Sequence, residues 1–264
     1  MTGKFKEVNQ QILKNLIFRI LAAWAIIIFV ITLLPVVLLM WIIGLYNEPK
    51  RTRYFRVISK IWMRIFFFLT GCNLKIKGKE NFVAGERYII TCNHNSLMDV
   101  PVATPFIPGA NKTIAKSEMA KIPLFGLIYK RGSVLVDRKD KKSRQDSFRK
   151  MKNVLALGMH MCIYPEGTRN KTDLPLKEFH DGAFKLATET SASIIPALIF
   201  NTRKVLPPGK SFYFHPAKME IHFLKPVKVE EGDNYELLKE KIHRIMSDYY
   251  LQHQKNNQEK LLAY

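Results

Sequence analysis

The longest apolar run lies near the N-terminus. From Ile20 to Leu45 no side chain is charged. As a helix this run would reach about 39 Å at 1.5 Å per residue, beyond the ~30 Å hydrocarbon core of a bilayer. Pro35 lies near its middle and predicts a kink or a break. Basic residues flank both ends of the run, so the charge pattern favours no single orientation for one straight span. We expect this run to enter a membrane.

The segment from Arg53 to Leu69 predicts a second helix of a different kind. Basic residues recur at three- and four-residue spacing and form one stripe: Arg53, Arg56, Lys60 and Arg64. Such a helix lies at a membrane interface, with its cations toward lipid phosphates or water. The alternative is a helix packed on the protein core with a solvated basic face. Gly71 is expected to end it. Residues 1–71 are therefore predicted to form an N-terminal membrane anchor.

Beyond Gly71 the pattern changes to short apolar runs that alternate with longer amphipathic segments, which predicts an α/β fold. This catalytic domain is expected to span residues 72–252, followed by a polar tail at 253–264. The predicted strands are Asn73–Ile76, Tyr88–Cys92, Lys112–Ala115, Gly132–Val136, Met161–Tyr164, Ile194–Phe200 and Met219–Leu224. The predicted helices are Ser96–Thr104, Ser143–Leu157, Gly182–Thr190 and Tyr235–Tyr250.

Charge and cysteine content narrow the function classes. The formal net charge of +20 calls for an anionic partner, which could be nucleic acid, an anionic membrane or a phosphate-bearing substrate. The three cysteines, Cys72, Cys92 and Cys162, are interpreted as reduced thiols in the core. There is no Walker loop, no Gly-x-Gly-x-x-Gly and no His-Glu-x-x-His, so the sequence predicts neither a nucleotide cofactor nor a metal.

The candidate chemistry centres on the stretch Asn93-His94-Asn95-Ser96-Leu97-Met98-Asp99. It follows a buried strand, and Ser96 is a plausible N-cap for the next helix. His94 would then lie at a strand end, with Asp99 one helical turn further on. A carboxylate on one imidazole nitrogen fixes the tautomer and leaves the other nitrogen to accept a proton. The alternative is a structural histidine beside a capping aspartate.

Three further blocks follow in order: Gly132–Arg138, Tyr164-Pro165-Glu166-Gly167-Thr168-Arg169, and Ile194-Ile195-Pro196-Ala197-Leu198. With the first stretch they resemble the glycerolipid acyltransferases, most closely the bacterial 1-acylglycerol-3-phosphate acyltransferases. The Asn-His-x4-Asp and Pro-Glu-Gly-Thr-Arg blocks match that family's motifs, and the other two match more loosely. The resemblance covers about Lys75 to Val229. One departure is Asn170, where many relatives carry Ser or Thr.

The resemblance implies a mixed β-sheet flanked by helices, preceded by the membrane-embedded helical anchor. It also implies a reaction, the transfer of a fatty acyl group from acyl-CoA or acyl carrier protein to the sn-2 hydroxyl of lysophosphatidic acid. The product is phosphatidic acid. His94 would be the general base and Asp99 would orient it. Cys92 and Ser96 flank the pair, but a nucleophilic role is disfavoured because Cys92 shares strand parity with apolar Ile90 and Ser96 is better explained as a helix cap.

The acceptor phosphate needs cations, and arginine suits it best because the guanidinium is planar and forked. We expect Arg138 and Arg169 to bind it, with Lys116 as a third positive charge; a surface ion pair is the alternative for either arginine. The turn Glu166-Gly167-Thr168 is also expected to line the substrate site.

The catalytic domain is expected on the cytoplasmic face of the membrane. Two alternatives stay open at this point. One is an acyltransferase for glycerol-3-phosphate, lyso-ornithine lipid or another lysolipid. The other is a non-catalytic basic module that binds membrane or nucleic acid. The uncharged N-terminal run and the His94/Asp99 pair argue against nucleic acid as the partner.

Overall fold

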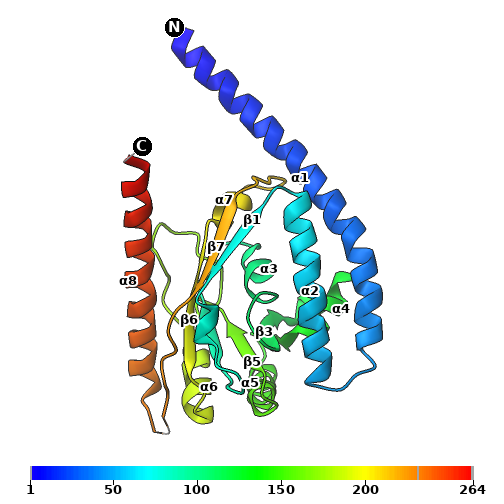
Figure 1. The fold of residues 1–264 in the computed structure, drawn as a ribbon, viewed down its shortest axis with the longest axis vertical. Helices are drawn as coiled ribbons and strands as arrows, with labels where there is room; N and C mark the ends of the chain where they lie inside the picture. The colour runs from blue at the N-terminus through cyan, green and yellow to red at the C-terminus, as the bar shows by residue number, and fades with distance from the viewer. Residues whose placement is uncertain (1, 231, 263–264) are drawn as a thin grey trace.

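A seven-stranded β-sheet forms the centre of the molecule, with helices on both faces (Figure 1). The computed structural model describes residues 2–230 and 232–262. The strand order is β1-β7-β6-β2-β5-β3-β4, and every neighbouring pair is parallel except β6 and β7. The predicted mixed sheet is therefore confirmed. The strands are β1 (Asn73–Lys77), β2 (Ile89–Cys92), β3 (Asn111–Lys116), β4 (Ser133–Val136), β5 (His160–Ile163), β6 (Ile194–Phe200) and β7 (Lys218–Phe223).

The helices form two layers. They are α1 (Thr2–Ile43), α2 (Lys50–Leu69), α3 (Asp99–Ala103), α4 (Phe125–Gly132), α5 (Lys141–Ala156), α6 (Gly182–Thr190), α7 (Thr202–Val205) and α8 (Tyr235–Leu262), with 3₁₀ turns at Lys79–Asn81 and Ser117–Lys121. Neighbouring residues of a strand point to opposite faces of the sheet. Accordingly Ile90 and Ile195 pack in one cluster with α1, α2 and α3. Ile89 and Ile194 pack in another, with α5, α6 and α8.

Helix α1 runs without a break from Thr2 to Ile43, with Pro35 inside it. A break at Pro35 is therefore excluded, while Figure 1 shows that the helix is bent. An internal proline costs about 3 kcal/mol because it removes a backbone hydrogen bond. Packing on α2 offsets this cost: Met40 is fully buried, and Trp62 Nε1 donates to Thr32 Oγ1 at 2.9 Å.

Helix α2 packs on the core along one face and is exposed along the other. Phe55, Trp62 and Phe66 are buried, whereas Phe68 is 82% exposed. The basic stripe is only partly a surface feature, because Arg56 donates its Nε–H to the carbonyl of Ile107. The alternative of a helix packed on the protein core therefore applies to the buried face of α2. The helix ends as predicted: Gly71 has φ +70°, and the N–H of Cys72 donates to Phe67 O at 2.8 Å.

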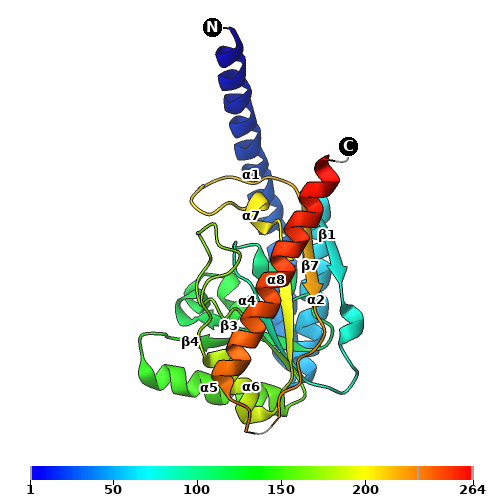
Figure 2. The same cartoon turned by 90° about the vertical axis from the view of Figure 1, so that its left-hand side faces the viewer.

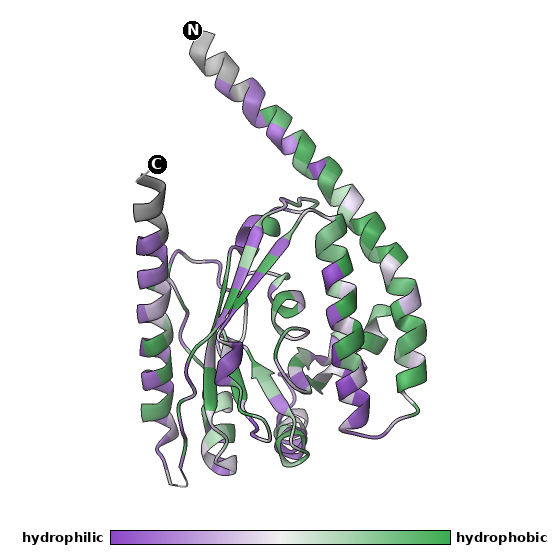
Figure 3. Cartoon of the chain, viewed as in Figure 1, coloured by the Kyte–Doolittle hydropathy of each residue, from purple (hydrophilic) through white to green (hydrophobic). Residues whose placement is uncertain are grey.

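By length and composition, one helix of the described chain could cross a membrane, namely α1 over Asn9–Ile43. Figure 3 shows its continuous apolar stretch next to the more mixed α2. Side chains of α1 and α2 share one hydrophobic cluster with the sheet, from Val37 and Phe67 to Ile199. The division at residue 71 stays a prediction, and the two segments have a common core.

Helix α8 continues to Leu262, so the predicted tail is helical over 253–262. Its Gln, Glu, Lys and Leu residues are good helix formers. Helix α5 also begins earlier than predicted, at Lys141, because Asp140 accepts the N–H groups of Lys142 and Ser143 as an N-cap.

Candidate active site

The predicted site residues follow the carboxyl ends of four neighbouring strands. Because β2, β5, β3 and β4 are parallel, these ends lie at one edge of the sheet. His94 follows β2, Glu166 follows β5, Lys116 ends β3 and Arg138 follows β4. Lys116 pairs with Val136 in the strand register, two residues before Arg138. Ligands of open α/β sheets bind at this edge.

His94 and Asp99 are in direct contact. His94 Nδ1 lies 2.8 Å from Asp99 Oδ2. The Asp99 side chain is fully buried, while that of His94 is 20% exposed. A buried carboxylate is costly unless donors surround it. Asp99 Oδ2 also accepts the N–H groups of Asn95 at 2.6 Å and Ser96 at 2.7 Å.

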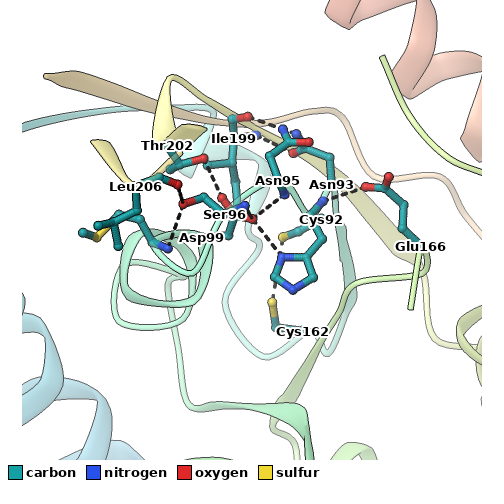
Figure 4. Close-up of polar contacts among 12 residues, drawn as sticks. Cys92, Asn93, Asn95, Ser96, Asp99, Cys162, Glu166, Ile199, Thr202 and Leu206 are labelled. Atoms are coloured by element: carbon teal, nitrogen blue, oxygen red, sulfur yellow. Dashed lines mark hydrogen bonds and ion pairs between the residues drawn. The ribbon is translucent and has the colours of Figure 1, made fainter. Parts of the chain in front are cut away.

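A fourth donor to Asp99 comes from helix α7, which follows β6. Thr202 Oγ1 donates to Asp99 Oδ1 at 2.6 Å, and Figure 4 shows the two side chains facing each other. With this donor set Asp99 acts only as an acceptor, so Nδ1 of His94 carries the proton that it donates. Nε2 is then the acceptor nitrogen, as a general base requires.

The helix after the histidine begins later than predicted. Helix α3 starts at Asp99, with Met98 at the N-cap position, so Ser96 is not its cap and Asp99 is not one turn inside it. The Ser96 hydroxyl instead donates to the Leu206 carbonyl at 2.9 Å and accepts the N–H of Met98 at 3.3 Å. Asp99 instead accepts the N–H groups of Asn95 and Ser96, which precede the helix.

Two polar side chains fix the backbone of the histidine loop. Asn93 exchanges two hydrogen bonds with the backbone of Ile199, at 3.0 Å and 2.7 Å. Glu166 accepts the N–H of His94 at 2.6 Å through Oε1 and the N–H of Lys177 at 2.9 Å through Oε2. Figure 4 shows the Asn93 side chain reaching Ile199 and the Glu166 carboxylate reaching the loop backbone. Burial raises the pKa of Glu166, and these two N–H groups lower it in part.

The turn after Glu166 is also tied down. Gly167 has φ +68°, and a Cβ there would lie 2.5 Å from His180 Cδ2, so only glycine fits. Its carbonyl accepts a hydrogen bond from Arg138 Nη1. Thr168 Oγ1 accepts from Lys177 Nζ at 2.7 Å.

The structure thus joins most of the predicted site residues in a chain of contacts. His94 contacts Asp99 and Glu166 directly, and Arg138 contacts Gly167. The side chains of Arg169 and Lys116 make no hydrogen bond or ion pair within 2–230 and 232–262. Arg169 is half-buried, and Lys116 is exposed at the end of β3.

Cys92 and Tyr164 lie beside the histidine. Cys92 is fully buried, with its Sγ 3.8 Å from that of Cys162. The contact with Cys162 and then burial raise the pKa of Cys92, so it is a thiol rather than the nucleophilic thiolate. All three cysteines are free and buried, as predicted. The Tyr164 ring lies 4.6 Å from the imidazole of His94 and fixes one side of it.

Sequence reasoning missed Thr202 and the role of Asn93. Thr202 lies far from Asp99 in the chain, and no local spacing connects them. Its position after a strand could have indicated a site residue, because Asn201 and Thr202 directly follow the buried strand β6 as His94 follows β2.

The chain also resembles known proteins in sequence and in fold. The Acyltransferase family model matches residues 73–200. Residues 73–200 are therefore similar to that family. The chain is 34% identical over 141 residues to a 1-acyl-sn-glycerol-3-phosphate acyltransferase of Helicobacter pylori, covering 53% of this chain and 58% of that one. A chloroplastic enzyme of the same name from Arabidopsis thaliana is 27% identical over 70% of this chain and 52% of its own length.

The fold of the chain, N-terminal helices included, also has a solved counterpart. The crystal structure of a 1-acyl-sn-glycerophosphate acyltransferase from Thermotoga maritima superposes with a TM-score of 0.74. The match covers 92% of this chain and 97% of that one at 21% identity. The resemblance to glycerolipid acyltransferases is confirmed, although the chain matches only about half the length of the Helicobacter and Arabidopsis proteins.

Proposed function

We propose that this protein transfers a fatty acyl group from a thioester, acyl-CoA or acyl carrier protein, to the sn-2 hydroxyl of 1-acylglycerol-3-phosphate. The product is phosphatidic acid. The observation that carries the proposal is the His94–Asp99 contact of 2.8 Å, held by buried donors in an acyltransferase domain. The relatives named for this reaction support the choice of acceptor.

In this mechanism Nε2 of His94 takes the proton of the acceptor hydroxyl while the oxygen attacks the thioester carbonyl. The tetrahedral intermediate then collapses, the carbon–sulfur bond breaks, and the leaving thiolate takes the proton from His94. Asp99 stabilises the imidazolium between these steps. Such a base contributes roughly 10²–10⁴-fold in rate.

The cations at the carboxyl edge of the sheet, where His94 also lies, bind the acceptor. Arg138 and Arg169 hold the phosphate and Lys116 adds a third charge, while Gly167 and Thr168 line the site. Glu166 acts on the histidine loop through the N–H of His94. In this assignment its substrate contact is indirect.

Membrane association serves the acceptor, because a lysolipid partitions into bilayers. The exposed apolar side chains of α1, such as Leu38 at 64% and Trp41 at 68%, support a lipid contact. We place the catalytic domain on the cytoplasmic side, where acyl-CoA and acyl carrier protein are made.

The test is an acyltransfer assay with the purified full-length chain in detergent. Each donor is offered with 1-acylglycerol-3-phosphate, glycerol-3-phosphate, a lyso-ornithine lipid and a lysolipid without a phosphomonoester. We expect phosphatidic acid to be the fastest product. Faster acylation of another acceptor would replace the proposed substrate, and no transfer from either donor would exclude an acyltransferase.

A further inference from the structure

Three metal-ligating side chains meet where α8 crosses the sheet, outside the candidate active site. Glu220 and His222 lie two residues apart on β7, so both point to the same face. His253 comes from α8, which Figure 2 shows lying across this face. One ligand atom from each side chain lies within 4.8 Å of the other two.

The spacing of these atoms suits a small transition-metal ion. His222 Nε2 lies 2.9 Å from Glu220 Oε2, and His253 Nε2 lies 3.9 Å from the same oxygen. Zinc binds His nitrogen and carboxylate oxygen at about 2.0–2.2 Å, so tetrahedral ligand atoms lie roughly 3.4 Å apart. The two observed distances bracket that value, and small side-chain rotations would equalise them.

Neighbouring groups orient the two imidazoles. Tyr249 Oη lies 3.1 Å from Nδ1 of His222, which leaves Nε2 toward the cluster. Metal-bound histidines usually have such a partner on the other ring nitrogen. The Phe200 ring stacks on the His253 ring with centroids 4.0 Å apart.

The three side chains are mostly buried, yet an ion can reach them from solvent. The His222 side chain is 1% exposed, whereas those of Glu220 and His253 are each 15% exposed, which gives an ion an entry path. One cation opposes it: Lys77 of β1 pairs with His222 in the strand register. Lys77 is exposed, so its ammonium group can turn toward solvent.

We propose that Glu220, His222 and His253 form a binding site for a divalent transition metal of the zinc class. Two nitrogens and one carboxylate oxygen favour Zn²⁺ over the oxygen-seeking Mg²⁺ and Ca²⁺. The bound ion would fasten the last turns of α8 to β7, beyond the part of α8 that Leu238, Ile242 and Met246 already hold in the core. The site takes no part in the reaction at His94.

The test is Zn²⁺ titration of the untagged full-length protein after chelation, followed by calorimetry and by the visible spectrum of the Co²⁺ form. Glu220→Gln and His253→Gln are the test variants, because both side chains reach the surface and each change removes one ligand atom. His243→Gln is the matched control, since His243 is also on α8 but contacts the Lys177 carbonyl instead. Melting temperature reports whether each variant folds.

We expect one equivalent of Zn²⁺ per chain, a rise in melting temperature, and no competition from Mg²⁺. Glu220→Gln and His253→Gln should bind at least tenfold more weakly, Tyr249→Phe about tenfold more weakly, and His243→Gln as the parent protein does. Lys77→Gln should bind more tightly. If the parent protein binds no Zn²⁺, or if all variants bind equally, the cluster is only a hydrogen-bonded group and the proposal is wrong.

Discussion

In the described part of the chain, the cations at one edge of the central sheet are paired with a carboxylate, whereas those at the opposite edge are not. At the edge opposite the candidate active site, Glu48 follows α1 and lies near the start of β3. It accepts from Lys112 Nζ at 2.9 Å, from Arg51 Nη2 at 2.8 Å and from Thr52 Oγ1 at 2.6 Å. At the carboxyl edge Lys116, Arg138 and Arg169 have no carboxylate partner among the described residues.

This difference separates charges that stabilise the fold from charges held for a ligand. Cations gathered without counter-charges repel one another, which costs free energy in the folded state. An anionic substrate removes that cost when it binds. At the paired edge, the one with Glu48, the protein itself supplies the anion. At the unpaired edge, the one with Arg138, the acceptor phosphate is the anion in the proposed reaction.

The largest effect is expected at the general base. His94→Ala should lower the acyltransfer rate by roughly 10²–10⁴-fold, because it removes the nitrogen proposed to take the hydroxyl proton. Single-turnover acyltransfer measures the loss, and melting temperature should show that the fold persists, because three other donors still surround Asp99. His243→Ala serves as the matched control. Near-normal turnover of His94→Ala would remove the proposed base.

At the paired edge, Glu48→Gln should reduce stability without a specific loss of acceptor binding. Burial alone would raise the pKa of Glu48, but hydrogen bonds from Lys112 and Thr52 bring it from 4.5 to about 2. At 1.36 kcal/mol per pH unit this shift corresponds to at most about 3–4 kcal/mol, which solvent screening reduces.

The pH dependence of this effect has a definite sign. A lowered carboxyl pKa stabilises the fold above the ordinary pKa of 4.5, and the stabilisation fades as pH falls toward 2. The stability difference between the parent protein and Glu48→Gln should therefore be full at neutral pH and shrink below about pH 4.5. Denaturant unfolding in detergent at several pH values measures it. A constant difference would mean that Glu48 acts through shape and not through charge.

The smallest effect is the sharpest test of the comparison. Arg138→Lys and Arg169→Lys keep the charge but lose the fork, so the acceptor KM should rise about tenfold, which is 1.4 kcal/mol. The donor KM should move much less. Arg51→Lys is the matched change at the paired edge and should lower only the melting temperature. An unchanged acceptor KM in both site variants would assign Arg138 and Arg169 to structure instead.

The sheet was predictable because its strands are buried on both faces. Runs such as Ile194–Phe200 are apolar throughout, so their ends stand out against polar loops. Each predicted strand end lies within one residue of the observed one. The pairing of His94 with Asp99 followed from their short separation in the sequence.

The remaining features depend on contacts that the local sequence does not carry. Helix α4 was missed because its eight residues follow Pro123 without a polar cap, and Leu124 takes φ +61° there. The bond from Thr202 to Asp99 exists only once β6 lies beside β2. Glu48 gave no signal either, because its partner Lys112 comes from a distant strand.

Helix α1 has a buried face and an exposed face, which should tolerate different substitutions during evolution. Leu33, Val36, Val37 and Met40 are buried and recur at helical spacing, each fitted to fixed neighbours. Leu34, Leu38 and Trp41 face outward, where the proposed lipid contact demands only hydrophobicity because acyl tails have no fixed shape. An aliphatic exchange that is silent at Leu38 would open a cavity or a clash at Val37, one residue away. Tolerance to substitution along this single helix should rise and fall with its 3.6-residue period.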